Sequence, residues 1–417
     1  MRRGWPEPGS GPQLRPRKRG LISSIDSVVQ IDSARTLNFQ MPDIELNKQT
    51  DFSAPDFREI SVLVYGCEAV QVENVLRKER LSIRDLGALL SPAAAERLPA
   101  LAARAAELTS LRFGRTIQLY TPLYLSSFCT NNCRYCGFSI ENNIERRLLS
   151  LDEAEREALL LAGRGFSHLL LVAGEAPAKM GVDYLETLAA RLRGRFASIS
   201  IEVQPLSEAD YRRLFKAGIT SVAVYQETYD RDVYRKVHLA GPKADMAYRL
   251  DTPARAAVAG MREVGLGALL GLSDWRLEGI ALGMHLAWLR SNYWQTALTV
   301  SFPRLRPAAG DFEPMVRVDE SDLAQLLFAL RIFDPDVGLL LSTREEARFR
   351  NGMIGLAPTR YSAGSCTAPG GYSNPDQQGE QFAIDDRRTL EEVCRDIRAR
   401  GFDPVRKDWD AVFQETA

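Results

Sequence analysis

Three cysteines lie within eight residues of one another, Cys129, Cys133 and Cys136, at the spacing C-x3-C-x2-C. Thiolates at such a spacing can curl around one face of a compact inorganic cluster, as they do in iron–sulfur proteins. A cluster of four irons that receives only three protein ligands keeps one iron open, and an open iron can bind a small molecule. The cysteine loop therefore predicts an iron–sulfur cluster that takes part in chemistry.

Other uses of the three thiols fit the sequence less well. A structural zinc site needs a fourth ligand of comparable quality close by, but the flanking cysteines are Cys67 and Cys366, and the nearest histidine is His168. A disulfide framework requires a higher density than six cysteines in 417 residues. The triplet therefore indicates a reducing compartment, and we expect a cytoplasmic protein.

The residues around the third cysteine make the hypothesis more specific. Tyr135 precedes Cys136, and Gly137 follows it. With these neighbours the loop resembles the signature loop of radical S-adenosylmethionine enzymes. In that family the open iron of a 4Fe–4S cluster chelates the amino and carboxylate groups of the methionine moiety. The resemblance thus implies both the cluster and S-adenosylmethionine as cofactors.

Composition limits what the rest of the chain can be. Apolar residues make up 45% and charged residues 26% of the 417 positions, which is typical of a globular protein with a sizeable core. The net charge of −1 argues against a nucleic-acid surface, and no apolar run reaches the roughly 18 residues of a membrane span. Residues 1–20 are rich in arginine, proline and glycine, and we expect residues 1–55 to be a disordered leader and linker.

The periodicity of the remaining chain changes twice. Residues 56–112 have helical spacing, with Ser91 as a cap and Pro92 at the first position of a helix that runs to Leu111. Over residues 113–366 short apolar runs alternate with amphipathic helices, which is the order of parallel strands joined by crossover helices. This pattern predicts an α/β fold, a (β/α)8 TIM-type barrel. Its strands are expected at residues 117–125, 168–172, 198–203, 221–225, 267–270, 297–301, 337–341 and 360–362.

Helices are expected between these strands and after the barrel. Residues 367–417 should form a loop and then a helix over 390–400, where Thr389 and Glu392 make a capping box. In a (β/α)8 barrel the chemistry lies at the carboxyl ends of the strands. The barrel helices are expected at residues 152–163, 184–193, 208–217, 253–264, 279–291 and 320–333.

Short strings spread along the chain carry a more specific resemblance. They include SSFCTNNCRYCGFS, VAGE, EVQPL, VYQETY, SFPRLRP, LSTRE and the terminal PVRKDWD. In this order they resemble the tyrosine lyases of bacterial thiazole (thiamine) biosynthesis, the 2-iminoacetate synthases, from about residue 56 to the end. One departure is Cys366, which stands where that family leads us to expect a polar or basic residue.

The resemblance implies a reaction and partners. A radical lyase of this family takes free L-tyrosine, breaks its Cα–Cβ bond and forms 2-iminoacetate and 4-methylphenol, while S-adenosylmethionine yields methionine and 5′-deoxyadenosine. It also implies an external one-electron donor of the flavodoxin or ferredoxin type. A complex with the thiazole synthase subunit is implied as well, because the imine hydrolyses readily in water.

The resemblance also assigns cofactor contacts to residues of the cysteine loop and of the strand ends. Glu175 stands at the position that accepts a bond from the S-adenosylmethionine ammonium; an exposed loop acid is the alternative. Tyr135 and Leu272 are expected near the adenine, and plain packing is the alternative for both. Gln204 and Gln226 are expected to bond ribose hydroxyls or substrate, or else to be satisfied structural amides.

Substrate tyrosine brings a carboxylate that needs a fork-shaped cation. Arg304 is the first candidate and Arg306 the second, and a salt bridge to a neighbouring loop is the alternative for both. His238 could handle a substrate proton, although a lone histidine is more often structural.

Three other functions compete with this hypothesis. The tyrosine lyase that matures iron-only hydrogenase resembles this chain through the barrel, but it adds a second cysteine cluster that Cys366 and Cys394 cannot supply. A tryptophan lyase of the same superfamily is a more distant alternative. A non-catalytic iron–sulfur scaffold or electron carrier would normally coordinate every iron with protein ligands.

Overall fold

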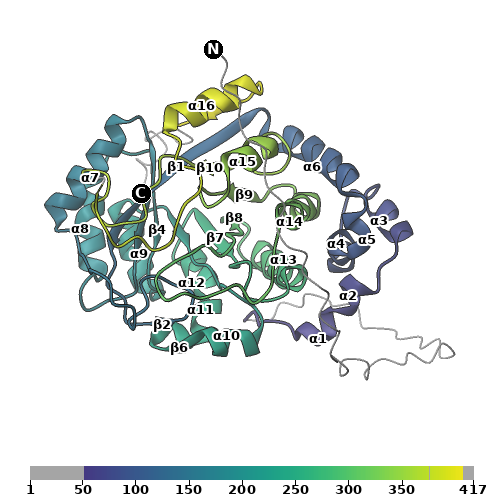
Figure 1. Ribbon diagram of the computed structural model, residues 1–417, viewed down its shortest axis with the longest axis horizontal. Coiled ribbons are helices and arrows are strands. Elements are labelled where there is room, and N and C mark those ends of the chain that lie inside the picture. The colour runs from purple at the N-terminus through teal and green to yellow at the C-terminus, as the bar shows by residue number, and fades with distance from the viewer. Residues whose placement is uncertain (1–50, 375, 407–417) are drawn as a thin grey trace, which may run out of the picture. The chain divides into compact units, whose positions relative to one another are not determined.

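The computed structural model describes residues 51–374 and 376–406. The predicted leader, residues 1–55, therefore lies almost entirely outside the described residues. Figure 1 shows helices arranged around a central sheet. Within the described residues, no helix is both long enough and apolar enough to cross a membrane.

The sheet is a closed parallel barrel, which confirms the predicted fold class. Its strands follow the order β10-β9-β8-β7-β5-β4-β3-β1, and parallel pairing of β10 with β1 closes the ring, with Gln118 opposite Arg360 and Tyr120 opposite Ser362. A further strand, β11 (Asp403–Val405), pairs with the start of β1. The barrel strands are β1 (Thr116–Ser126), β3 (His168–Ala173), β4 (Ser198–Glu202), β5 (Ser221–Ala223), β7 (Glu263–Gly267), β8 (Ala297–Ser301), β9 (Gly338–Leu341) and β10 (Arg360–Ser362).

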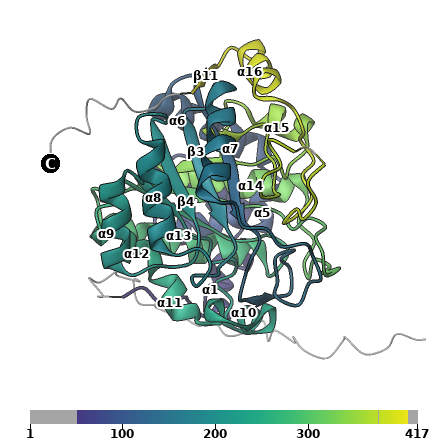
Figure 2. The same cartoon turned by 90° about the vertical axis from the view of Figure 1, so that its left-hand side faces the viewer.

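Helices cover the outside of this barrel, as Figure 2 shows for α7 and α8 over β3 and β4. Their starts are marked by local capping: Ser150 and Glu153 form a reciprocal capping box at α7, and Thr389 and Glu392 form the predicted one at α16. The longer helices after β1 are α7 (Leu151–Gly163), α8 (Val182–Leu192), α9 (Glu208–Ala217), α13 (Trp275–Asn292), α14 (Glu320–Phe333) and α16 (Leu390–Ala399). The shorter ones are α10 (Arg231–Val237), α11 (Met246–Leu250), α12 (Thr252–Val258) and α15 (Ala347–Met353).

The fifth barrel strand begins earlier than the sequence prediction of residues 267–270. Helix α12 ends at Val258, and Gly260 follows with φ of +95°, a left-handed conformation that terminates helices. The chain is therefore free to enter β7 at Glu263, and the predicted helix over 253–264 is wrong at its end. Residues 268–270 add only isolated bridges, from Ala268 to Glu227 and from Leu270 to Arg304.

Six helices in the described part precede the barrel, and the predicted helix from Pro92 to Leu111 is two of them. Ser91 caps the first and Pro92 begins it, as expected. The break falls just before Pro99. In a continuous helix the ring of this proline would clash with the carbonyl oxygen of the residue four positions earlier. These helices are α1 (Phe57–Ile60), α2 (Val62–Tyr65), α3 (Ala69–Val75), α4 (Ile83–Leu90), α5 (Pro92–Ala95) and α6 (Leu98–Phe113).

Candidate cluster and substrate site

The cysteine loop leaves the end of β1 and is pinned on two sides. Its short strand β2 (Asn132–Cys133) pairs antiparallel with β6 (His238–Ala240), which places Cys133 opposite His238. On the other side Gly174 lies so close that an added Cβ would stand 2.3 Å from the carbonyl oxygen of Phe128. The loop can pack against the end of β3 only because residue 174 has no side chain.

The three cysteines lie close enough to affect one another electrostatically, and Cys133 is the most buried of them. Cys133 is 4% exposed, and burial, assisted by the charges of Cys136 and Cys129, raises the pKa of its thiol to about 12. Burial also raises the pKa of Cys136, whose Sγ accepts a 3.6 Å hydrogen bond from Gln381 Nε2. Burial and mutual repulsion disfavour the thiolate form unless a cation binds, so this donor set fits an iron–sulfur cluster.

A single metal ion fits the same thiols less well. Among residues 51–374 and 376–406, no three His, Cys, Asp or Glu side chains are grouped tightly enough to hold one ion. In a four-iron cluster each cysteine binds a different iron, so the sulfurs stand further apart than around a single zinc. The described residues therefore offer no ligand set for a zinc knuckle.

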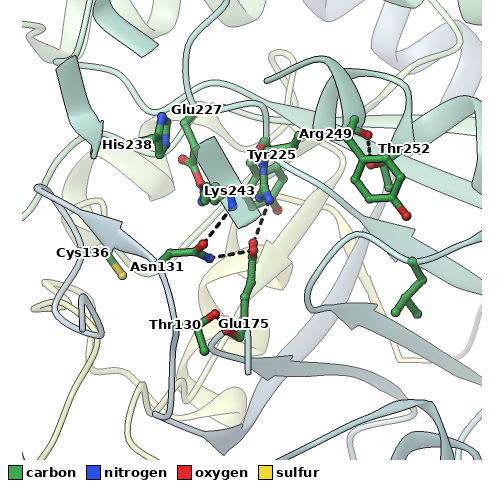
Figure 3. Close-up of polar contacts among 12 residues, drawn as sticks. Thr130, Asn131, Cys136, Glu175, Tyr225, Glu227, His238, Lys243, Arg249 and Thr252 are labelled. Carbon is green, nitrogen blue, oxygen red and sulfur yellow. Dashed lines mark hydrogen bonds and ion pairs between the residues drawn. The ribbon is translucent and has the colours of Figure 1, made fainter. Parts of the chain in front are cut away.

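Glu175 lies beside the cysteine loop and is fully engaged rather than solvated (Figure 3). Its Oε1 pairs with Arg249 Nη1 at 2.7 Å, and its Oε2 accepts from Asn131 Nδ2 at 2.8 Å. Burial opposes ionisation of this carboxyl, but Arg249, Lys243 and Asn131 outweigh it and hold the pKa below its ordinary value. Glu175 is thus a buried anion, not an exposed loop acid, and each of its oxygens has a lone pair left for another donor.

A second ion pair lies next to the first. Lys243 Nζ pairs with Glu227 Oε1 at 2.7 Å, and the backbone N–H of Lys243 donates to Asn131 Oδ1 at 2.8 Å. Glu227 has φ of +71°, an uncommon conformation for a residue with a side chain. Asn131 therefore ties the two ion pairs to the cysteine loop, between Cys129 and Cys133.

Tyr135 of the cysteine loop is held by a hydrogen bond to His238. The Tyr135 hydroxyl lies 2.7 Å from His238 Nε2, and His238 Nδ1 lies 2.9 Å from the carbonyl oxygen of Tyr234. A carbonyl can only accept, so Nδ1 carries the hydrogen and Nε2 accepts from Tyr135. With both ring nitrogens committed, the geometry favours a positioning role for His238, and its proton-handling role stays a prediction. Leu272 packs with Cys133 and Tyr135 in the same small apolar cluster.

The two predicted glutamines each have an unused polar atom. Gln204 Nε2 donates to the carbonyl of Met180 at 3.2 Å, but its Oε1 has no partner in the described residues. Gln226 Nε2 likewise has no hydrogen-bond partner in the described residues. Buried polar atoms are normally bonded, so these orphans fit a polar ligand such as the ribose of S-adenosylmethionine.

Arg304 and Arg306 are already paired with a buried carboxylate. Arg304 binds Glu345 through two nitrogens, with Nε at 2.9 Å from Oε2, and Arg306 Nη2 reaches the same oxygen at 3.3 Å. Arg306 also pairs with Asp385 at 2.7 Å. Both arginines thus make the salt bridges that were the alternative reading, and substrate capture by either one stays a prediction.

A cavity of about 540 Å³, which includes space open to solvent, lies at this mouth of the barrel. The sequence prediction missed two charged residues in its wall, Glu202 at the end of β4 and Arg344 after β9. Both stand in strings that were recognised, EVQPL and LSTRE, directly after or within a strand end. Their position relative to the strand ends was therefore a usable signal. The aromatic wall is formed by Tyr120, Tyr124, Tyr225 and Phe382.

A second cavity fills the lumen of the barrel below the first. The two share Tyr120, Leu170, Tyr225 and Ser301. Its far end is crossed by a bidentate ion pair from Arg360 to Glu263, with contacts of 2.5 and 2.9 Å. The lumen is therefore lined by polar groups as well as by the strand side chains.

The fold and this site define a radical S-adenosylmethionine barrel, and comparisons with known proteins agree. The model of the Radical SAM superfamily matches residues 123–282, and that of the Biotin and Thiamin Synthesis associated domain matches residues 301–403. The chain is 46% identical to the 2-iminoacetate synthase of Escherichia coli over 86% of its own length and 95% of that protein, and equally similar to the Salmonella typhimurium protein over 85% and 95%. The chain belongs to the 2-iminoacetate synthase family.

Solved structures support the same barrel. HydG, a maturase of the FeFe-hydrogenase, superposes with a TM-score of 0.79 at 30% identity, covering 86% of this chain and 80% of that one. Methylornithine synthase superposes with a TM-score of 0.66 at 23% identity, over 82% and 99% of the two chains, which shows the fold alone.

Proposed function

We propose that this protein is a 2-iminoacetate synthase that cleaves the Cα–Cβ bond of L-tyrosine to 2-iminoacetate and 4-methylphenol. Support comes from the 46% identity to two 2-iminoacetate synthases over almost their whole length. It also comes from the three-cysteine loop, which Gln381 links to Tyr124 in the wall of an aromatic cavity. The loop with three cysteines is the observation that carries the chemistry, because three protein ligands leave one iron of a four-iron cluster open for a ligand.

Cys129, Cys133 and Cys136 would hold the 4Fe–4S cluster, and Glu175 would accept from the ammonium of S-adenosylmethionine. When bound, these cofactors supply hydrogen-atom abstraction from the substrate. Gln204 and Gln226 would bond polar groups of the nucleoside with their unused atoms. Tyr135, fixed by His238, and Leu272 would form the apolar wall around the adenine.

The test is anaerobic incubation of the reconstituted, dithionite-reduced protein with tyrosine and S-adenosylmethionine. We expect 4-methylphenol and 5′-deoxyadenosine in the wild type. Cys133→Ala should form neither, since a pocket with two thiolates cannot hold the cluster. Formation of 5′-deoxyadenosine without 4-methylphenol, or of 3-methylindole from tryptophan, would contradict the assignment of tyrosine as substrate.

An external one-electron donor of the flavodoxin or ferredoxin type and a complex with the thiazole synthase subunit complete the proposal. The second rests on chemistry, because 2-iminoacetate hydrolyses in water and a partner that receives it directly would protect it. Co-purification of the reconstituted protein with thiazole synthase tests the complex.

A further inference from the structure

Two opposite charges line the mouth cavity and do not pair with each other. Arg344 and Glu202 both face this cavity, and no ion pair in the described residues includes either of them. Each contributes to the electrostatic surroundings of the other. They are therefore close enough to interact across the cavity, but further apart than a direct salt bridge.

Arg344 is held in place without being neutralised. Its guanidinium stacks on Phe382 at 3.4 Å from the ring centroid, and Nη1 makes a 3.5 Å contact with the carbonyl oxygen of Arg304. Burial lowers the pKa of Arg344, and this shift is opposed by nearby Tyr124, Glu227 and Glu202. A fork of N–H donors thus points at a cavity without a carboxylate to bind, and keeping such a charge there costs stability.

Glu202 is the complementary case. No hydrogen bond to its carboxylate is found in the described residues, whereas Glu175 and Glu227 nearby are both paired. Burial, followed by the charge of Glu227, raises the pKa of Glu202 to about 7, against the influence of Arg344, Lys243 and Arg249. An unpaired carboxylate in a cavity is a common mark of a functional site.

We propose that Arg344 and Glu202 bind the two charged ends of a free α-amino acid, with Arg344 on the carboxylate and Glu202 on the α-ammonium. This inference rests on the proposed function for the identity of the amino acid. A zwitterion inserted between the two side chains satisfies both charges at once, which neither can do for the other across the gap. The tyrosine and phenylalanine walls then receive the aromatic side chain.

Tyr124 places this site next to the cluster pocket. Its hydroxyl donates to Gln381 Oε1 at 2.8 Å, and Gln381 Nε2 in turn contacts Cys136 Sγ at 3.6 Å. The wall of the cavity and the cysteine loop are therefore joined through a single amide. An amino acid held by Arg344 and Glu202 lies on the cluster side of the barrel.

Arg304 is the alternative candidate for binding the substrate carboxylate. Substitution of Arg304 and substitution of Arg344 should have different effects on stability. Glu345 is 1% exposed and depends on Arg304 and Arg306 for its pairing. Arg304→Met leaves it underpaired and should lower the melting temperature. Arg344→Met removes a partly buried charge that has no carboxylate partner in the described residues, and it should leave the melting temperature unchanged or raise it.

The experiment measures tyrosine binding to the anaerobically reconstituted holoenzyme with S-adenosylmethionine, by equilibrium dialysis. Two analogues report on the two ends: tyramine lacks the carboxylate, and 3-(4-hydroxyphenyl)propanoate lacks the ammonium. We expect Arg344→Met to weaken tyrosine binding about tenfold or more and tyramine binding hardly at all. Glu202→Gln should weaken tyrosine binding similarly but leave 3-(4-hydroxyphenyl)propanoate unaffected. Exposed Arg195→Met is the neutral control.

Several outcomes overturn the proposal. Tyrosine binding by Arg344→Met at the wild-type level, or an equal loss of tyrosine and tyramine binding in that variant, contradicts it. Loss of the preference for tyrosine over tyramine in Arg304→Met alone also contradicts it, because it assigns the carboxylate to Arg304. If the variants show the expected binding pattern but the wild type forms no 4-methylphenol, the proposed function is contradicted and the binding roles of Arg344 and Glu202 are supported. If the wild type forms 4-methylphenol and both variants bind tyrosine normally, only the binding roles of Arg344 and Glu202 are contradicted.

Discussion

Some charged side chains at the mouth of the barrel form ion pairs and others do not, and this difference separates structural from functional residues. Glu175, Glu227 and Glu345 each have a cation within 3 Å. Such pairs stabilise the loops, because removal of one partner leaves the other as an uncompensated buried charge. Glu202 and Arg344 have no such partner in the described residues, so their retention is better explained by a ligand than by stability.

The residue most sensitive to size near the cluster is Gly174. Its Cβ in Gly174→Ala would stand 2.3 Å from the Phe128 carbonyl oxygen and 3.1 Å from the Cys129 Cβ. We expect this variant to lose about 1–3 kcal/mol of stability by overpacking and to incorporate less iron, because the cysteine loop must move away from β3.

Iron content after reconstitution and the urea midpoint measure these two effects. Gly163→Ala in α7 is the matched control, since an added Cβ there meets no atom within 4 Å. It should retain full iron content and gain up to about 1 kcal/mol. Normal iron content in Gly174→Ala would show that the loop adapts without losing its cluster.

At the scale of elements, the sequence predicted most of the barrel because its signals are local. Helices α9 and α14 and strands β8 and β10 have the predicted bounds, since caps and apolar runs mark their ends. The strand β2 and its partner β6 were not predicted, because two or three residues carry no periodicity. Their pairing of Cys133 with His238 comes from a contact between segments a hundred residues apart.

For the site, too, local sequence signals predicted some features and missed those that depend on tertiary contacts. Strand ends and the cysteine spacing located the mouth, and Cys129, Cys133, Cys136 and Glu175 do lie together there. The sequence could not tell which of Arg304 and Arg344 is free to bind a ligand. The difference is that Arg304 pairs with the buried Glu345, which is far from it in sequence. Which charge is already paired is a tertiary property.

One of the contacts that attach the helices preceding the barrel is a buried amide. Gln325 in α14 donates to the carbonyl oxygens of Leu89 and Ser91, both at 2.9 Å, and its Oε1 accepts from Arg276. Gln325→Leu should lower the free energy of unfolding by about 1–3 kcal/mol, because two buried carbonyls lose their donor. Urea unfolding followed by circular dichroism tests this.

A control for this prediction lies on the surface. Gln378→Leu changes an exposed side chain and should shift stability by less than about 0.5 kcal/mol. If Gln325→Leu unfolds at the same urea concentration as this control, the amide is not a main attachment of α4 and α5 to the barrel.

For the whole molecule, the distribution of cysteines limits the chain to one cluster. All six are free: Cys67 lies between α2 and α3, Cys366 follows β10, and Cys394 is buried in α16. These three are carried by separate elements, and Cys394 Sγ instead accepts a 3.7 Å contact from Arg406. A second cluster of the kind expected in a hydrogenase-maturing lyase therefore has no ligand set.

The fully reconstituted protein should thus bind about four irons per chain. A variant with Cys67→Ser, Cys366→Ser and Cys394→Ala should bind as many, whereas Cys129→Ser should lose most of them. Because nothing in the described residues holds a second cluster, the two-carbon product should leave intact and appear, after hydrolysis, as glyoxylate and ammonium, with no carbon monoxide or cyanide. Iron and sulfide analysis with gas and cyanide detection decides the matter: about eight irons per chain, or cyanide formed from tyrosine, would place the chain with the maturases instead.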